Sequence, residues 1–109
     1  MIPSLAMTAI PGLSSDLMDK LGVVLRGALT CGRVVLFGSR AKGTHRPGSD
    51  IDLAFQQTNL TDDELRFVAR LLEEAVFPFS VDVINDGPDL YAPLKEHIAH
   101  VGLEIYRVP

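Results

Sequence analysis

Residues 38–53 read GSRAKGTHRPGSDIDL, and this stretch determines how the rest of the chain is interpreted. It follows an apolar run, Val34–Phe37, that is typical of a short buried strand, and it opens with Gly38 and Ser39. Glycine at such a junction lets the backbone approach a phosphate closely, and successive N–H groups there attract an anion, to which the Ser39 hydroxyl adds a donor. A strand followed by Gly-Ser is also a common ordinary turn, so both interpretations remain open on these two residues alone.

Two carboxylates follow at the start of the next expected strand. Asp50 and Asp52 are two residues apart, so their side chains project from one face of the strand, while Ile51, Leu53 and Phe55 fill the opposite face. At a separation of roughly 6 Å, two such charges repel by about 3 kcal/mol at an effective dielectric constant of about 20. A folded sheet tolerates this with a compensating cation or proton. The alternative is a solvated strand end, where an aspartate accepts hydrogen bonds from a turn.

A third carboxylate, Asp82, lies within the β-branched run Phe79–Ile84, where burial of an unpaired charge is costly. If this strand lies beside the strand of Asp50 and Asp52, the usual spacing of about 4.8 Å brings three carboxylates together. Three oxygen donors from two neighbouring strands suit Mg²⁺, which retains water and takes further ligands from substrate phosphates. Taken alone, Asp82 is equally well a residue of an edge strand or a strand end.

The remaining sequence predicts an α/β (α+β) fold with a short mixed sheet backed by helices. Thr61 and Glu64 form a capping box at the start of one helix. Expected helices run from a Ser14 or Ser15 cap to about Thr30, from the Thr61 cap to about Ala75, and from an Asp89 cap to about Val101; expected strands are Val34–Phe37, Ile51–Gln56, Phe79–Ile84 and Leu103–Tyr106. Residues 1–109 are expected to form one domain, with 1–13 as an extended N-terminal segment.

The composition favours a globular protein of the reducing cytoplasm. The chain has 109 residues, of which 47% are hydrophobic, and its single cysteine cannot form an internal disulfide. No apolar window approaches the roughly 18 to 20 residues of a membrane span, so no membrane partner is expected.

Charge is distributed unevenly along the chain. Residues 1–46 hold six basic and two acidic side chains, a net charge of +4, whereas residues 47–109 hold four basic and twelve acidic ones, a net charge of −8. Nonspecific nucleic-acid binding needs an extended basic face, so direct nucleic-acid binding is not expected. A local basic segment in an acidic chain suits a pocket for a small anionic molecule instead.

Together these motifs resemble the nucleotidyltransferase superfamily that includes DNA polymerase β, and within it the minimal (MNT-type) nucleotidyltransferases. The family motif is Gly-Ser, ten residues, then Asp-x-Asp, and here residues 40–49 separate Gly38-Ser39 from Asp50-Ile51-Asp52. The later Asp82 in Val-Asp-Val and the order of the elements also match, so the resemblance covers about residues 14–107. It implies a minimal polymerase-β-like core.

The resemblance also implies a role for each carboxylate. Asp50 and Asp52 would hold two Mg²⁺ ions, and Asp82 would be the third carboxylate and a candidate base for the acceptor hydroxyl. The implied reaction transfers AMP from ATP to an acceptor and releases pyrophosphate.

The phosphate-binding residues follow from the same resemblance. Gly38 and Ser39 would hold the β- and γ-phosphates of the nucleoside triphosphate. Arg40 and Lys42 would be charge partners of the triphosphate; the alternative for each is a solvated loop cation.

Family members of this size pair with a small helical HEPN-type protein. The resemblance therefore implies that the chain is the antitoxin of such a module and adenylylates the HEPN ribonuclease. Two alternatives remain: a non-catalytic antitoxin that neutralises its partner by stoichiometric binding, and a nucleotidyltransferase for a small hydroxylated molecule. Three clustered carboxylates favour catalysis, because a pure binding protein has little use for them.

The three histidines are assigned no role in this reaction. His45 lies in the motif loop and is expected to face solvent, with contact to a phosphate as the alternative. His97 and His100 are three residues apart on the last expected helix and are expected to be surface or partly packed side chains.

Overall fold

The fold is built on one four-stranded mixed sheet, and the computed structural model describes residues 7–109. The strands are β1 (Arg33–Phe37), β2 (Ile51–Gln56), β3 (Val81–Asn85) and β4 (Leu103–Arg107); the helices are α1 (Ser15–Ala28), α2 (Gly38–Lys42), α3 (Asp62–Ala75) and α4 (Ala92–Val101). The strand order is β3-β2-β1-β4, with β2 and β3 parallel and the other neighbours antiparallel. This confirms the expected mixed sheet backed by helices.

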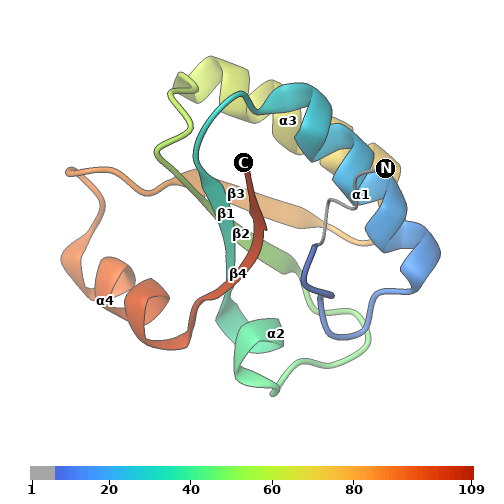
Figure 1. The fold of residues 1–109 in the computed structure, drawn as a ribbon. Coiled ribbons are helices and arrows are strands. Elements are labelled where there is room, and N and C mark those ends of the chain that lie inside the picture. The colour runs from blue at the N-terminus through green and yellow to red at the C-terminus, as the bar shows by residue number, and fades with distance from the viewer. Residues whose placement is uncertain (1–6) are drawn as a thin grey trace.

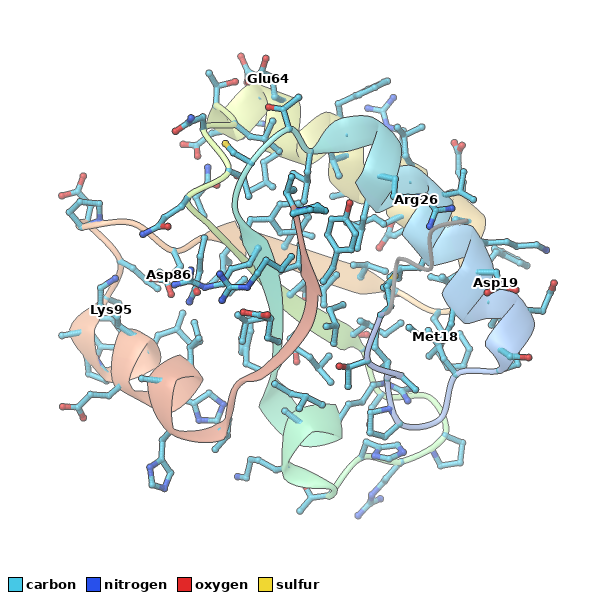
Figure 2. The ribbon with its side chains drawn as sticks, viewed as in Figure 1. Met18, Asp19, Arg26, Glu64, Asp86 and Lys95 are labelled. Carbon is cyan, nitrogen blue, oxygen red and sulfur yellow. The ribbon has the colours of Figure 1, made fainter. Side chains whose placement is uncertain are left out.

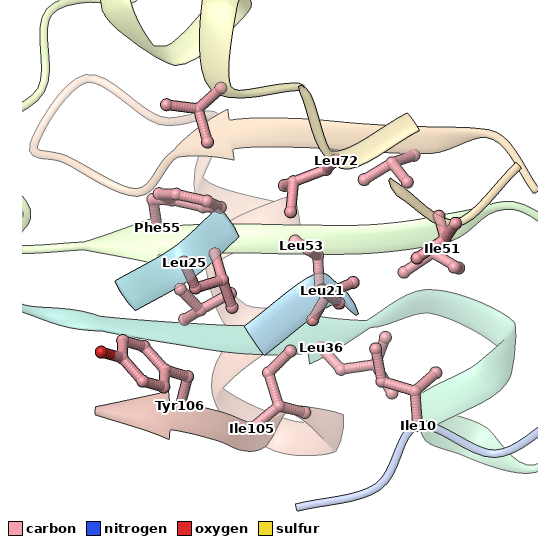
Figure 3. Packing of buried hydrophobic residues seen from close by; sticks show 14 of the residues in the cluster. Ile10, Leu21, Leu25, Leu36, Ile51, Leu53, Phe55, Leu72, Ile105 and Tyr106 are labelled. Carbon is pink, nitrogen blue, oxygen red and sulfur yellow. The ribbon is translucent and has the colours of Figure 1, made fainter. Parts of the chain in front are cut away.

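The helices divide between the two faces of the sheet. Figure 1 shows α1 and α3 together on one side and α4 on the other, with the short α2 at the end of β1. The main core lies under α1 and α3, where Leu21 and Leu25 of α1 and Leu72 of α3 pack against Leu53 and Phe55 of β2 (Figure 3). A smaller apolar cluster lies under α4 and includes Val35, Phe37, Ala54 and Ile98.

The β2–α3–β3 unit aligns two strand starts at one edge of the sheet. Thr61 and Glu64 form the expected capping box, in which each side chain bonds the backbone of the other residue. The helix carries the chain back across the core, so β3 enters the sheet parallel to β2. Because β1 runs antiparallel to β2, the end of β1 lies at the same edge as the starts of β2 and β3.

Helix α4 is fixed to the sheet at the opposite edge by a short polar chain (Figure 2). The Lys95 ammonium contacts the Asp86 carboxylate at 2.7 Å, and the other oxygen of Asp86 accepts a hydrogen bond from the Gln56 amide, also at 2.7 Å. The Asp86 side chain is only 7% exposed, so this pairing is better shielded than an ordinary surface salt bridge. The anchor holds the start of α4 to the sheet.

Several element boundaries differ from the sequence expectation. Helix α1 ends at Ala28 instead of Thr30, and β3 starts at Val81 because Phe79 still belongs to the turn that follows α3, where its N–H bonds the carbonyl of Val76. Helix α4 is capped by Tyr91 and not by Asp89, because residues 87–90 form a separate turn.

The N-terminal segment 1–13 lies partly outside the described residues, and its described part, 7–13, contains no helix or strand. There the Thr8 N–H bonds the carbonyl of Ile105 on β4. Within residues 7–109, no helix combines the length and the apolar character needed to cross a membrane.

Candidate active site

The sheet edge described above brings the motif residues together. Phe37, the last residue of β1, pairs with Asp52 of β2, and Asp52 pairs in turn with Asp82 of β3. The strand adjacency on which the predicted carboxylate cluster depended is therefore present. Gly38 and Ser39 follow directly on Phe37, so the Gly-Ser turn and two of the three carboxylates share one edge of the sheet.

Gly38 is required by its backbone and by its neighbour. Its φ is +75°, a region that residues with a Cβ rarely adopt, and a Cβ there would collide with the Asp52 carboxylate. Gly38 also begins α2, whose first N–H groups have no partner within the helix and face away from it at this end. The glycine thus allows Asp52 to lie directly against the first turn of α2, at which no described side chain accepts a capping hydrogen bond.

The three carboxylates differ in exposure and in proton affinity. Asp50 and Asp82 are exposed, whereas Asp52 is half-buried. Burial raises the pKa of the Asp52 carboxyl, and the neighbouring charges of Asp82 and Asp50 raise it further. His97 and Arg40 act in the opposite direction on the same pKa. Asp52 therefore lies in a field of like charges from Asp82 and Asp50 that His97 and Arg40 partly offset.

Arg40 is buried and so is not a solvated loop cation, whereas its part as a charge partner of the triphosphate stays a prediction. The side chain is 1% exposed. Its Nη1 donates to the Pro11 carbonyl at 2.7 Å, and its Nε and Nη2 donate to the Ser49 carbonyl at 3.2 and 2.8 Å. The guanidinium carbon also lies 5.0 Å from the centre of the Phe79 ring, in a cation–π contact.

The position of Arg40 gives it an indirect part in the site. It holds the carbonyl of Ser49, the residue before Asp50, and so fixes the end of the motif loop. Burial lowers the pKa of its guanidinium, while Asp50 and Asp52 raise it, which shows that Arg40 lies within the field of both carboxylates. Lys42, at the end of α2, is exposed, and no described residue forms an ion pair with it.

Sequence reasoning missed the contribution of α4. The His97 ring stands edge-on to Phe37, with 6.2 Å between ring centres and 83° between planes, and it lies close enough to Asp52 to affect its pKa. The spacing of His97 and His100 in the sequence does not predict this proximity, because the position of His97 depends on how α4 crosses β1. His45 also differs from expectation: it is half-buried, and its Nδ1 has no hydrogen-bond partner among the described residues.

The donor chemistry fits Mg²⁺, although a complete ligand set is not assembled. Within residues 7–109, no three acidic, histidine or cysteine side chains gather closely enough to hold a metal ion. Asp52 and Asp82 are neighbours in register, whereas Asp50 precedes the strand and its side chain is exposed. Carboxylate oxygens that repel one another at an open edge are the ligands Mg²⁺ takes, with water and substrate filling the remaining positions.

Several solved structures share this fold. A toxin–antitoxin crystallised with AMP-PNP matches with a TM-score of 0.69 at 24% identity, covering 82% of this chain and 72% of that one. A tri-AMPylated HEPN toxin of Shewanella oneidensis in complex with its MNT antitoxin matches at 0.63 and 20%, covering 84% and 70%. A putative minimal nucleotidyltransferase matches at 0.62 and 24%, covering 80% and 90%. No curated protein sequence matches the chain significantly.

The sequence itself supplies the family. Residues 20–108 match the model of the family described as polymerase beta, nucleotidyltransferase, which is most of the chain. The match includes the Gly-Ser turn and all three carboxylates, and the structure brings the turn, Asp52 and Asp82 to one edge of the sheet. On this agreement of sequence and fold, the chain belongs to the polymerase beta nucleotidyltransferase family.

Proposed function

We propose that this protein transfers AMP from ATP to a hydroxyl group of a HEPN-type toxin and acts as its antitoxin. The observation that carries the proposal is the pairing of Asp52 with Asp82 beside the Gly38-Ser39 turn. A turn with free N–H groups accommodates phosphate, and carboxylates beside it accommodate the cation that accompanies a triphosphate. We therefore assign nucleotide binding and activation of the acceptor hydroxyl to the same edge of the sheet.

Each residue at the edge has a part in the proposed reaction. The acceptor oxygen attacks the α-phosphorus of ATP, the bond from that phosphorus to the bridging oxygen of the β-phosphate breaks, and pyrophosphate leaves. Asp82, which is exposed on the edge strand, takes the proton of the acceptor hydroxyl. Gly38 and Ser39 hold the β- and γ-phosphates, and Lys42 contributes charge near them.

Asp50 and Asp52, with Asp82 as a third ligand, are the residues that would hold two Mg²⁺ ions. Bound there, the ions would stabilise charge on the attacking and leaving oxygens. Burial raises the pKa of Asp52 most, and repulsion by Asp82 and Asp50 raises it further; a cation among the carboxylates would offset that repulsion, which supports this assignment.

The partner is proposed from the solved relatives. One is a toxin–antitoxin with AMP-PNP, and another pairs a tri-AMPylated HEPN toxin with its MNT antitoxin. The same fold and the same family support a HEPN-type protein as the acceptor here. The cytoplasm, where such a toxin would act, is the proposed location.

The test compares intact masses of the HEPN-type protein after co-expression with three forms of this chain. The wild type is expected to add one or more AMP groups, and the double variant Asp50→Asn/Asp52→Asn none. Lys20→Gln, an exposed change on α1 far from the sheet edge, serves as the matched control and is expected to modify like the wild type.

The outcomes separate the alternatives. If wild type and double variant both protect cells and neither changes the mass of the toxin, the protein is a stoichiometric antitoxin. If ATP and Mg²⁺ stabilise the chain but only small hydroxylated molecules accept AMP, the protein acceptor is wrong.

A further inference from the structure

A hollow on the outer surface of α1 and α3 is unrelated to the proposed active site. It has a volume of about 630 Å³ and lies between Val23, Val24 and Gly27 of α1 and Phe67, Val68 and Leu71 of α3. We call it the α1/α3 groove. Because α1 and α3 cover the apolar face of the sheet, the groove faces away from the carboxylates of Asp52 and Asp82.

The walls of the groove are apolar and unusually exposed. Val23 is 61% exposed and Phe67 is 58% exposed, and they stand on opposite walls. An apolar hollow of this size flanked by two exposed large apolar side chains is typical of a protein-binding surface. Each wall is a 14-residue helix, so the groove matches a third helix laid between them.

Gly27 is a second, independent observation. Glycine within a helix makes the helix less stable than alanine does. No contact among the residues that the structure describes explains why glycine occupies position 27. A Cβ at Gly27 would meet no atom of the described residues within 4 Å, unlike one at Gly22, which would lie 2.9 Å from the Met7 sulfur. The missing side chain instead opens the groove, as close approach by another chain requires.

The charges around the groove decide between two occupants. Helix α3 carries five acidic and two basic residues, a net charge of −3, whereas α1 is balanced. Two copies of this chain packed groove to groove would bring two α3 helices together, and the negative charges of these helices would repel. Asp63 and Glu64 line the groove and leave it acidic even though Asp63 pairs with Arg66; Figure 2 shows Glu64 at the start of α3. A partner with basic residues beside an apolar stripe fits this face.

We infer that the α1/α3 groove binds a basic amphipathic helix of the protein partner, and this rests on the proposed function for the partner's identity. The contact is separate from the acceptor site, because it lies on the other side of the sheet. A partner held there leaves the nucleotide edge open and raises the local concentration of its acceptor hydroxyl. Binding and AMP transfer are thereby assigned to different surfaces.

The test measures the affinity of the full chain for the purified HEPN-type protein by titration calorimetry. Phe67→Ser and Gly27→Leu are each expected to raise Kd at least tenfold, the first by removing an anchor and the second by filling the groove. Gly27→Leu is also expected to melt no lower than the wild type, so its loss of binding would not reflect unfolding. Phe77→Ser is the matched control, since Phe77 is 78% exposed and lies outside the groove.

The outcomes distinguish this inference from the proposed function. Groove variants that bind as tightly as the wild type overturn the inference, whether or not AMP is transferred. Weakened binding by the groove variants, with Asp50→Asn/Asp52→Asn still binding, supports it even if no transfer occurs. Concentration-dependent dimerisation of this chain alone, abolished by Phe67→Ser in sedimentation, would show that a second copy fills the groove and would overturn it.

Discussion

The two faces of β2 carry different side chains where the strand begins: one face is apolar, and the other carries Asp52 ahead of Ala54, which packs in the smaller cluster under α4. Ile51, Leu53 and Phe55 are at most 1% exposed under α1 and α3, whereas Asp52 on the other face lies among like charges. Full burial of each apolar side chain contributes about 1.5–3 kcal/mol. The apolar face thus fixes the register of the strand, and the register holds Asp52 opposite Asp82 although the two repel.

Stability and function depend on different faces of β2. A slip by one residue would exchange the two faces of β2, so the buried face prevents the carboxylates from moving apart. Changes on the apolar face are therefore expected to affect unfolding, and changes on the carboxylate face to affect the reaction.

The largest expected effect is on activity and comes from Asp52→Asn. Removing this carboxylate is expected to lower AMP transfer by about 10³-fold or more, as loss of a central catalytic group does in other enzymes. The same change removes a charge that the fold disfavours, so the free energy of unfolding at pH 7 is expected to rise. AMP-transfer assays and urea unfolding, carried out on the same preparation, measure the activity and the stability of the variant. A variant that is both inactive and less stable would show that the Asp52 carboxylate also stabilises the fold.

The next effect is on stability and comes from the adjacent residue. Leu53→Ala empties a fully buried site and is expected to lower the free energy of unfolding by about 2–5 kcal/mol. The measurement is urea unfolding, with Leu53→Met as the conservative control, expected to cost less than about 1.5 kcal/mol. If Leu53→Ala lowers the free energy of unfolding no more than Leu53→Met does, the apolar face of β2 does not hold the register.

The alternation along β2 explains why this part of the fold was predictable. Apolar and acidic residues alternate here, with Ile51, Leu53 and Phe55 on one face and Asp50 and Asp52 on the other. Such an alternation is local in the sequence, so it predicts the strand and its two faces directly. The Thr61–Glu64 capping box is equally local. The start of α4 was predicted wrongly for a local reason too, since Asp89 resembles a cap but belongs to a preceding turn.

The unpredictable parts of the site depend on contacts between distant residues. Arg40 bonds Pro11, 29 residues away in the sequence, and its charge alone does not distinguish that role from phosphate binding. His97 reaches the vicinity of Asp52 because α4 packs across the sheet through Ile98 and is held at its start by the Lys95–Asp86 contact. The proximity of Asp82 to Asp52 was predictable only on the condition that their strands are neighbours.

A smaller expected effect tests Arg40 against Lys42. Arg40→Met leaves the carbonyls of Ser49 and Pro11 without their donor and is expected to lower the free energy of unfolding by about 1–3 kcal/mol. Lys42→Met is expected to change it by less than about 0.5 kcal/mol and to raise KM for ATP instead. Urea unfolding and steady-state kinetics separate the two. A stable Arg40→Met variant with only a raised KM would assign Arg40 to the phosphate site.

The smallest expected effect is the pH dependence of stability that Asp52 introduces. Because the pKa of Asp52 in the folded protein is raised above its ordinary value of 3.8, the folded state holds this proton more tightly than the unfolded chain does. The wild type therefore loses stability as pH rises from 3.8 through the raised pKa, and the loss is constant above it. Asp52→Asn cannot titrate, so its advantage over the wild type is expected to be near zero below pH 3.8 and to grow with pH to a plateau. Urea unfolding of both proteins across this range measures the difference, and Mg²⁺ is expected to reduce it at neutral pH by offsetting the repulsion among the carboxylates. An advantage that shrinks as pH rises would mean that the fold stabilises the Asp52 carboxylate instead of disfavouring it.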